Sequence, residues 1–317
     1  MTKEFETEVI DAPVQGTDKW LEWRKQGITA TEAAVIMHPS YGRSAMTVYT
    51  DKLGITEQDQ SDEKGYFEWG HILEDDLVEK FKKAHPEFTD FSTGRLYQRD
   101  WCKCSLDAQC RDQFGEPVIV ECKSGQRIDK WNPIPQNYFA QIQWQMYVTG
   151  IRRGFFAVII AEDGWHYFER EVKYDEEFVK GMLERCHLVW DAIQIKTPPK
   201  LFSDAEADKD AINALAGESG HSGDPVPVPD DQVEEFIRLK TAAEEATEKF
   251  DAFKNRIAFA MIETSKLVKS NGKTFASWVE RKGNVTIDKA LLQREYPDVY
   301  EKCLKQGAGC RYIKYNV

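Results

Sequence analysis

Apolar residues recur at two different spacings along this chain, and each spacing predicts one type of element. In residues 66–84 the apolar positions return every three or four residues, which places them on one face of a helix: Trp69, Ile72, Leu73, Leu77 and Phe81. Further helices are predicted over 30–37, 136–149, 176–195 and 231–265.

Short apolar runs between turn residues predict strands. Val118–Cys122 follows the turn signal Gly115-Glu116-Pro117, and residues 95–101 form a second predicted strand. Residues 155–161 and 165–172 are predicted to pair as a hairpin, because Glu162-Asp163-Gly164 separates them. The chain therefore mixes helices with a set of short strands.

Residues 203–230 differ from the rest of the chain. They hold seven acidic residues and one basic residue among Ala, Gly, Ser and Pro. This composition predicts an acidic linker that contains no more than a turn of helix. It divides the chain into a first domain over 1–202 and a helical C-terminal module with short strands over 231–317.

The overall composition narrows the class of protein. A length of 317 residues is typical of two domains. A net charge of −12 argues against a passive nucleic-acid coat, but it leaves a nuclease with bound cations open. No apolar run approaches the roughly 20 residues of a membrane helix, and the N-terminus shows no signal segment. Seven cysteines, an odd number, favour a reducing, cytoplasmic setting without membrane association.

The strongest candidate chemistry is Asp107, followed by Glu121-Cys122-Lys123 on the next predicted strand. Alternate side chains of a strand share a face, so Glu121 and Lys123 point the same way, and an aspartate on a neighbouring strand can meet Glu121 across the ladder. Two carboxylates and the Cys122 carbonyl are hard oxygen ligands suited to Mg²⁺. Lys123 can then orient a water molecule, and the cation can lower the pKa of that water. A Glu-x-Lys pair is also typical of a surface salt bridge, so the motif by itself leaves both interpretations open.

Two further positions favour the chemical interpretation, although each also has an ordinary structural explanation. Glu74 lies at the edge of the apolar face of helix 66–84, as a third carboxylate of the site or as a solvated residue. Arg24 precedes Thr29-Ala30-Thr31 at a predicted helix start, and an arginine beside a helix N-terminus suits a phosphate. The alternative is a threonine cap with a surface arginine.

Glutamines on the predicted helix 136–149 add a third signal. Gln141 and Gln143 lie among apolar and aromatic residues, where side-chain amides need hydrogen-bond partners. A role that faces DNA and a place at the polar edge of a core helix are equally open.

The ordered set of motifs resembles the phage lambda exonuclease and YqaJ-type viral recombinase family of the PD-(D/E)xK nuclease superfamily. The resemblance covers about residues 15–195 and rests on Trp20, Arg24, Ile28-Thr29-Ala30-Thr31, Trp69-Gly70 with Glu74, Ser105-x-Asp107, Glu121-x-Lys123 and Ala140-Gln141-x-Gln143. It implies an α/β (α+β) fold, with a restriction-endonuclease-like core of mixed sheet flanked by helices. It implies a 5′→3′ exonuclease of phage-type homologous recombination that depends on Mg²⁺, with Mn²⁺ able to substitute. Such an enzyme degrades one strand of double-stranded DNA and leaves a 3′ overhang for a single-strand annealing protein.

The resemblance also assigns roles residue by residue. It implies metal ligation by Glu74, Asp107, Glu121 and the Cys122 carbonyl, water activation by Lys123, and an active-site glutamine at Gln141. The residues Arg24, Thr31 and Ser105 match positions that hold the DNA 5′-phosphate, with Thr31 in place of a serine of the lambda enzyme. It further implies a homo-oligomer, with a trimeric ring as one form, encoded by a phage or prophage and acting on linear DNA in the cytoplasm of a bacterial host.

This chain departs from the family pattern in two ways, and its cysteines need a separate comparison. Ser105-Leu106-Asp107-Ala108 replaces Ser-Pro-Asp-Gly, so a turn after Asp107 is expected to form without that Pro and Gly. The tail after residue 200 has no counterpart in the compact lambda enzyme, which leaves the trimer and the role of residues 231–317 open. Some related nucleases hold an iron–sulfur cluster on four cysteines, but the spacing here differs, so no cluster is expected and buried cysteines are preferred.

Two other functions remain as alternatives. One is an endonuclease or a single-strand nuclease on the same fold. The other is a protein that binds DNA ends and recruits a partner, with little catalysis of its own.

Overall fold

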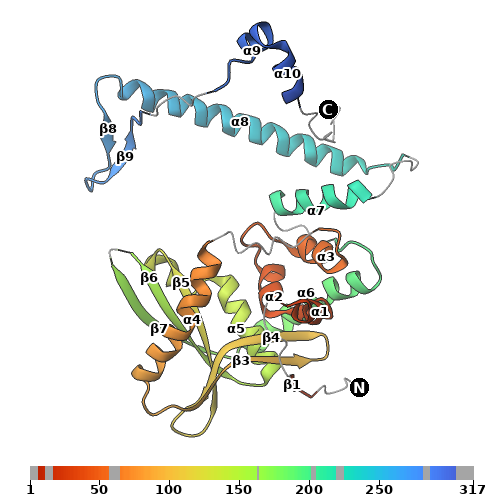
Figure 1. Cartoon of the computed structure of the whole chain (residues 1–317), viewed down its shortest axis with the longest axis vertical. Coiled ribbons are helices and arrows are strands. Elements are labelled where there is room, and N and C mark those ends of the chain that lie inside the picture. Colours follow the sequence, from red (N-terminus) through yellow and green to blue (C-terminus); the bar gives the residue numbers. More distant parts are fainter. Residues whose placement is uncertain are drawn as a thin grey trace. The chain divides into compact units, whose positions relative to one another are not determined.

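The structure is a computed structural model, and it describes residues 6–10, 17–56, 65–162, 164–200, 205–218, 225–280 and 286–304, without the side chains of 65–72, 205 and 218. The chain divides into two compact units, residues 1–222 and 223–317 (Figure 1). The boundary falls inside the segment predicted to be a linker. Each unit is described by itself.

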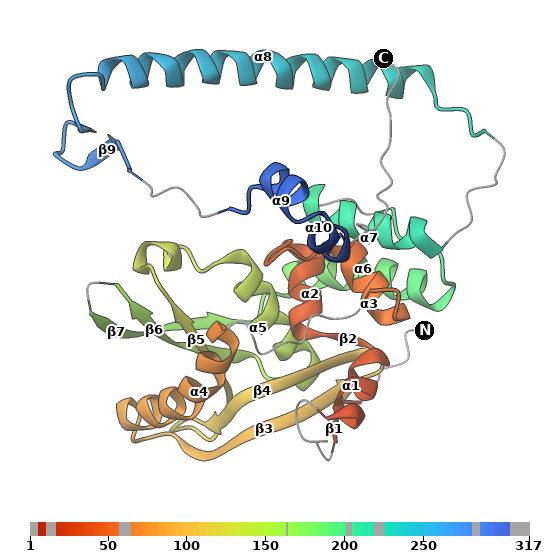
Figure 2. The same cartoon turned by 45° about the horizontal axis from the view of Figure 1, so that its top comes forward.

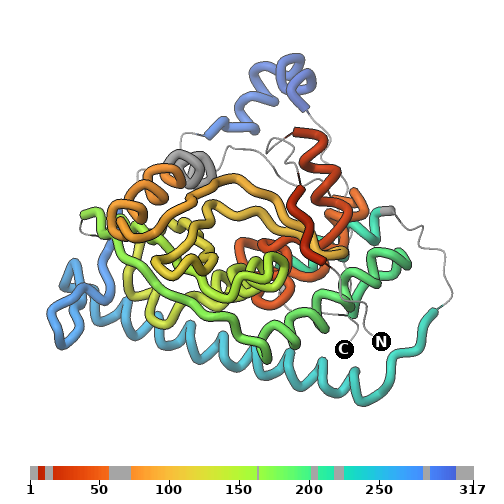
Figure 3. The backbone as a smooth tube through the Cα atoms, turned by 90° about the horizontal axis from the view of Figure 1, so that it is seen from below, coloured from red at the N-terminus to blue at the C-terminus, as the bar shows by residue number. Residues whose placement is uncertain are grey.

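The first unit is built on a seven-stranded mixed sheet (Figure 1). Its order is β1 (Glu8–Ile10), β3 (Thr89–Arg99), β4 (Cys102–Arg111), β5 (Pro117–Gly125), β6 (Arg153–Ala161) and β7 (Trp165–Lys173), with β2 (Ile28–Thr29) beside β4. The pairs β2–β4 and β5–β6 are parallel, and the others are antiparallel. Figure 3 shows β3 and β4 as two long neighbouring segments in orange and yellow.

Helices cover both faces of this sheet. In unit 1 they are α1 (Asp18–Lys25), α2 (Ala30–Met37), α3 (Ala45–Leu53), α4 (Gly65–Ala84), α5 (Gln136–Thr149), α6 (Glu176–Gln194) and α7 (Ala205–Glu218), with a 3-10 turn at Ile128–Trp131. Successive residues of β5 point to opposite faces: Ile119 packs in a large cluster that includes α5, whereas Val118 and Val120 pack in a smaller cluster with α4. In Figure 2, α2 and α5 lie on the upper side of the β3–β4 pair.

The predicted α/β fold class, a mixed sheet flanked by helices, is confirmed. The predicted helices over 30–37 and 136–149 match α2 and α5 at both ends, and the hairpin of 155–161 with 165–172 is β6–β7. The apolar face of α4 is buried at Leu77 and Phe81; the side chains of Trp69 and Ile72 lie outside the described residues.

The segment 203–230 contains more structure than the sequence predicts. Helix α7 spans 14 residues and belongs to the first unit, where it packs against α3. Ala207 and Ala211, one turn apart, are both buried, so small residues allow close helix packing. A composition typical of a linker hid this helix, because the residues it buries are two alanines and an aspartate, Asp208, instead of large apolar residues.

The second unit consists of α8 (Asp230–Ala260), the hairpin β8 (Lys266–Val268) and β9 (Thr274–Ser277), and the short helices α9 (Lys289–Glu295) and α10 (Pro297–Cys303). The predicted helix over 231–265 ends earlier than expected, at Met261. There the indole of Trp278 donates a hydrogen bond to the Met261 carbonyl at 2.8 Å, which ties the hairpin to the end of the helix. A helical module with short strands is therefore present.

Two expectations from composition can be compared with the described residues. Among them, no helix is both long and apolar enough to cross a membrane. The cysteines of β4 are buried, as are the apolar residues around them, in agreement with the structural role predicted for Cys102, Cys104 and Cys110.

Candidate active site

The strands β4 and β5 bring Asp107 and Glu121 together. Their antiparallel ladder runs from Arg111–Pro117 to Ala108–Val120, which makes Asp107 and Glu121 the next opposing positions. At that point the Asp107 carboxylate accepts a hydrogen bond from the Cys122 amide at 2.7 Å. The Asp107 carboxylate thus accepts the hydrogen bond that a backbone carbonyl of β4 would accept if the ladder continued beyond Ala108–Val120.

The prediction of a turn after Asp107 is wrong. Strand β4 continues through Asp107 to Arg111, because β3 pairs with it on both sides, at Leu106 and at Ala108. Leu106 packs in the large apolar cluster and Ala108 in the smaller one. Asp107 therefore lies where the strand leaves one apolar cluster and enters the other.

Glu121 is almost fully buried and is held by three donors. Its Oε1 accepts from the Lys123 ammonium at 2.5 Å and from the Gln141 amide at 2.6 Å, and its Oε2 accepts from the Gln145 amide at 2.7 Å. The prediction that Glu121 and Lys123 share a face is confirmed. The ion pair is formed within one buried strand, which differs from the surface cross-strand bridge that the motif also allowed.

Helix α5 supplies both of the amides that hold Glu121. Gln145 was missed by the sequence analysis, although it lies one helical turn after Gln141 on the same face. Its amide also donates to the Ser105 carbonyl at 3.1 Å, so it connects α5, β4 and β5. Gln143 instead donates a hydrogen bond to the Lys173 carbonyl and accepts one from the Asp175 amide. These contacts match the second interpretation of Gln143, a polar residue of a core helix.

Glu74 comes to the same region from α4. Burial, together with the carboxylates of Glu121 and Glu74, raises the pKa of Asp107 well above its usual range. The Cys122 thiol points toward this helix and lies 3.7 Å from the Glu74 carbonyl. The carboxylates of Asp107, Glu121 and Glu74 therefore lie near enough to influence one another's charge; Glu121 is buried, and the other two are half-buried.

Lys123 is the cation of this group. Burial opposes its charged form, but the carboxylates of Glu121 and Asp107 outweigh burial and raise the pKa of the ammonium. The ammonium lies 5.1 Å from the centre of the Tyr138 ring, and the Tyr138 hydroxyl is 2.7 Å from that of Tyr41. These contacts hold Lys123 in its charged form beside the carboxylates.

The donor set suits a hard divalent cation, because crowded buried carboxylates gain from a positive charge between them. Within the described part of the chain, however, no three His, Cys, Asp or Glu side chains already converge as a metal site. Both oxygens of Glu121 are engaged by Lys123 and the two glutamines. A carboxylate offers about four acceptor sites, so Oε2, which accepts a single hydrogen bond, keeps a site with which Glu121 could ligate a cation.

The predicted phosphate-binding residues lie next to this group. Strand β2 runs parallel to β4 with Thr29 opposite Lys103, so the chain enters α2 beside the stretch of β4 that carries Ser105. Thr31 lies in the first turn of α2 and is exposed, as is Ser105. Helix N-termini present free amides and a positive dipole end, both of which favour anions.

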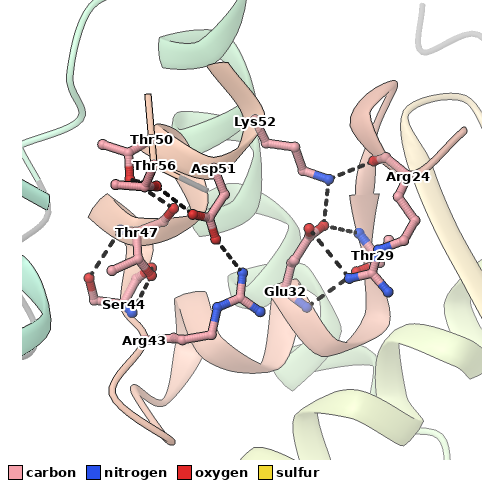
Figure 4. Close-up of polar contacts among 10 residues, drawn as sticks. All are labelled: Arg24, Thr29, Glu32, Arg43, Ser44, Thr47, Thr50, Asp51, Lys52 and Thr56. Atoms are coloured by element: carbon pink, nitrogen blue, oxygen red, sulfur yellow. Dashed lines mark hydrogen bonds and ion pairs between the residues drawn. The ribbon is translucent and has the colours of Figure 1, made fainter. Parts of the chain in front are cut away.

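Arg24 reaches the same junction from the last turn of α1 (Figure 4). Its guanidinium lies 3.7 Å from Glu32, whose other oxygen pairs with Lys52 at 2.8 Å. Neither Glu32 nor Lys52 was predicted from the sequence as part of a site. The capping box of Thr29 and Glu32 is a recognisable signal for Glu32, whereas the capping box of α3 lies at Ser44 and Thr47, at the opposite end of that helix from Lys52.

Comparison with known proteins shows which proteins this chain resembles. Residues 19–152 match the family model of the YqaJ-like viral recombinase domain. The chain is 25% identical over 311 residues to the uncharacterized protein YqaJ of Bacillus subtilis (strain 168), and the match covers 91% of each protein.

Solved structures with a similar fold include an alkaline exonuclease, LHK-Exo, from Laribacter hongkongensis. It is 18% identical, with a TM-score of 0.45, and the match covers 57% of this chain and 94% of the other. A complex of LHK-Exo with dAMP gives 17% identity, a TM-score of 0.44 and the same coverage. The predicted resemblance to the YqaJ-type viral recombinases is confirmed by the family model, which residues 19–152 match.

Proposed function

We propose that this protein is a metal-dependent deoxyribonuclease of phage-type recombination, which degrades one strand of linear double-stranded DNA from its 5′ end. The observation that carries the proposal is the cluster of Asp107, Glu121 and Lys123 at the point where β4 and β5 part. The family match to a viral recombinase domain supports it. The 3′ overhang that remains would be the substrate of a single-strand annealing protein.

In this proposal Glu74, Asp107, Glu121 and the Cys122 carbonyl would hold Mg²⁺, or Mn²⁺ in its place. When bound, the cation supplies charge stabilisation on the phosphoryl group and lowers the pKa of water. Lys123 orients the attacking water through its ammonium, which Glu121 holds at 2.5 Å. Gln141 and Gln145 keep Glu121 in place through Oε1 and Oε2.

The proposed polarity rests on the junction of β2 and α2. There Arg24, Thr31 and Ser105 would bind the terminal 5′-phosphate, because a guanidinium and a helix N-terminus both favour an anion. The Ser105 carbonyl and Glu121 accept from the same Gln145 amide, so the phosphate subsite and the hydrolytic group are directly connected. An end held in this way places the first phosphodiester bond near Asp107.

The test uses linear duplex DNA labelled at the 5′ end of one strand, with and without Mg²⁺, and a closed circular DNA. The expected result is Mg²⁺-dependent release of 5′ nucleotides from the linear duplex and an intact circle. Cleavage of the circle would instead establish an endonuclease. Tight binding to ends without any hydrolysis would contradict the proposal and favour a DNA-end-binding protein.

A further inference from the structure

Two buried lysines from outside α1 hold the last turn of that helix. The Lys52 ammonium donates to the Arg24 carbonyl at 2.6 Å, and the Lys103 ammonium donates to the Trp23 carbonyl at 2.6 Å. Both lysines are almost fully buried. Cations stabilise the unpaired carbonyls at a helix C-terminus, so these bonds fix the backbone from which the Arg24 side chain extends.

Glu32 connects this turn to α2 and α3 (Figure 4). It is fully buried, and its Oε2 lies 2.8 Å from both the Lys52 ammonium and the Thr29 amide. Its Oε1 has no hydrogen-bond partner among the described residues and lies 3.7 Å from the Arg24 guanidinium. Lys52 therefore takes most of the charge of Glu32, and Arg24 is restrained without being neutralised.

The Arg24 guanidinium is left with unused donors. It stacks over the Trp20 ring at 4.6 Å, and its buried Nε has no partner among the described residues. Burial lowers the pKa of Arg24 although Glu32 acts in the opposite direction. An unsatisfied buried donor costs free energy that a bound anion recovers.

The charges of this group suit a dianion. Arg24 and the buried Lys52 and Lys103 face one buried carboxylate, that of Glu32, an excess of two positive charges. Of the other charges nearby, Glu22 is exposed to solvent, and Arg43 and Asp51 pair with each other at 2.8 Å. Gly27 makes the approach of Lys103 possible, because a Cβ atom at Gly27 would lie 2.9 Å from the Lys103 side chain and 2.2 Å from the Trp101 carbonyl. A terminal phosphate ester carries a charge of about −1.5 to −2, whereas an internal phosphodiester carries about −1.

We propose that Glu32, Lys52 and Lys103 form a buried clamp that positions Arg24 and matches the local charge to a terminal phosphomonoester. The three residues are then positioning residues that determine which DNA ends are accepted, and they act through Arg24. This inference rests on the proposed function for the identity of the ligand. It adds the residues that give Arg24 its selectivity.

The test measures binding of a short blunt duplex with 5′-phosphate or 5′-hydroxyl ends in EDTA, so that no hydrolysis is required. The full chain is expected to bind the phosphorylated duplex about tenfold more tightly or better, since hydrogen bonds to charged groups are strong. Arg24→Gln and Glu32→Gln are each expected to remove most of this preference. The double variant Arg24→Gln/Glu32→Gln is expected to lose no more than Arg24→Gln alone.

A second variant guards against loss of folding. Glu32→Gln/Lys52→Met removes both partners of the buried ion pair at once, a change that is often close to neutral for stability. This double variant is also expected to lose the preference for 5′-phosphate ends. The control Arg43→Gln/Asp51→Asn removes the neighbouring 2.8 Å ion pair at no change in net charge and is expected to keep the preference.

Two outcomes would overturn the inference, and they are distinguishable. If the full chain prefers 5′-phosphate ends and folded Glu32 variants keep that preference, or if the losses at Arg24 and Glu32 add, the clamp is wrong while the proposed phosphate site stands. If the full chain binds both duplexes equally, recognition of the 5′-phosphate fails as well. Neither result depends on whether the protein hydrolyses DNA.

Discussion

At the scale of residues, the molecule concentrates its unusual chemistry on one buried carboxylate. Glu121 has three donors, one of them charged, although an isolated buried carboxylate is unfavourable. Such an arrangement is stable only because its partners are also buried and well placed. Variants that each change one partner, measured for both activity and stability, distinguish a loss of chemistry from a loss of folding.

Lys123→Met is expected to abolish most DNA hydrolysis, by about 100-fold or more, because it removes the group that orients water. The matched control is Lys130→Met, on the exposed 3-10 turn. Rates of nucleotide release from linear duplex, with thermal unfolding of each variant, provide the measurement. Equal activity of the two folded variants would remove Lys123 from the proposed site.

Gln145 and Gln143 offer a second matched pair, since both are buried on α5. Each substitution by Met is expected to lower the free energy of unfolding by about 1–3 kcal/mol, the cost of unpaired buried groups. Only Gln145→Met is expected to slow hydrolysis, by about tenfold or more, because its amide holds Glu121. Urea unfolding and initial rates, measured on the same preparations, separate the two effects; a similar rate loss for Gln143→Met would contradict this assignment.

At the scale of elements, α1, α2 and α3 are joined at their ends by buried charges. Glu32 caps α2 through Thr29, pairs with Lys52 of α3 and faces Arg24 of α1. Burial opposes ionisation of Glu32, but the charges of Lys52 and Arg24 lower its pKa to about 2. The junction that carries the proposed phosphate subsite therefore depends on an ionised glutamate.

This dependence predicts an effect of pH on stability. Because the folded-state pKa of Glu32 lies below that of the unfolded chain, its ionised form stabilises the fold above about pH 4.5 and loses that contribution as the pH falls toward 2. Glu32→Gln is expected to cost about 3 kcal/mol at pH 7, and less at pH 4 and pH 3. Urea unfolding at these pH values measures the difference; a difference that does not shrink on acidification would show that charge is not the cause.

At the scale of the whole molecule, every residue of the proposed site belongs to the first unit, residues 1–222. The packing of α7 on α3 makes this boundary later than the predicted end of the first domain at residue 202. If this acidic chain acts on DNA as proposed, it must bind it through local cations, and Arg24, supported by the buried Lys52 and Lys103, is the proposed one at the DNA end.

A chain of residues 1–222 is expected to fold and to keep Mg²⁺-dependent hydrolysis of linear duplex. A chain of residues 1–200 lacks α7 and is expected to unfold several degrees lower, because Ala207, Ala211 and the α3 surface lose their contact. Thermal unfolding and nuclease assays of both chains and the full protein test this. Loss of hydrolysis in a folded 1–222 chain would mean that the second unit contributes to the site.

The sequence by itself determined the elements and the local relations within them. A period of three to four residues specifies the apolar face of α4, and alternation within β5 places Glu121 and Lys123 on one face, because both relations are properties of the local backbone. The order of the motifs likewise indicated the resemblance to the YqaJ-like viral recombinase domain, which residues 19–152 match.

Tertiary structure decided which distant groups meet. The parting of β4 from β5 gives Asp107 the Cys122 amide, and the packing of α5 brings Gln145 to Glu121. The convergence of α1, α2, α3 and β4 surrounds Glu32 with Arg24, Lys52 and Lys103. No local pattern encodes such contacts, because they depend on how strands register and helices pack across long separations in sequence, and α7 shows that even a helix can depend on the surface that buries it.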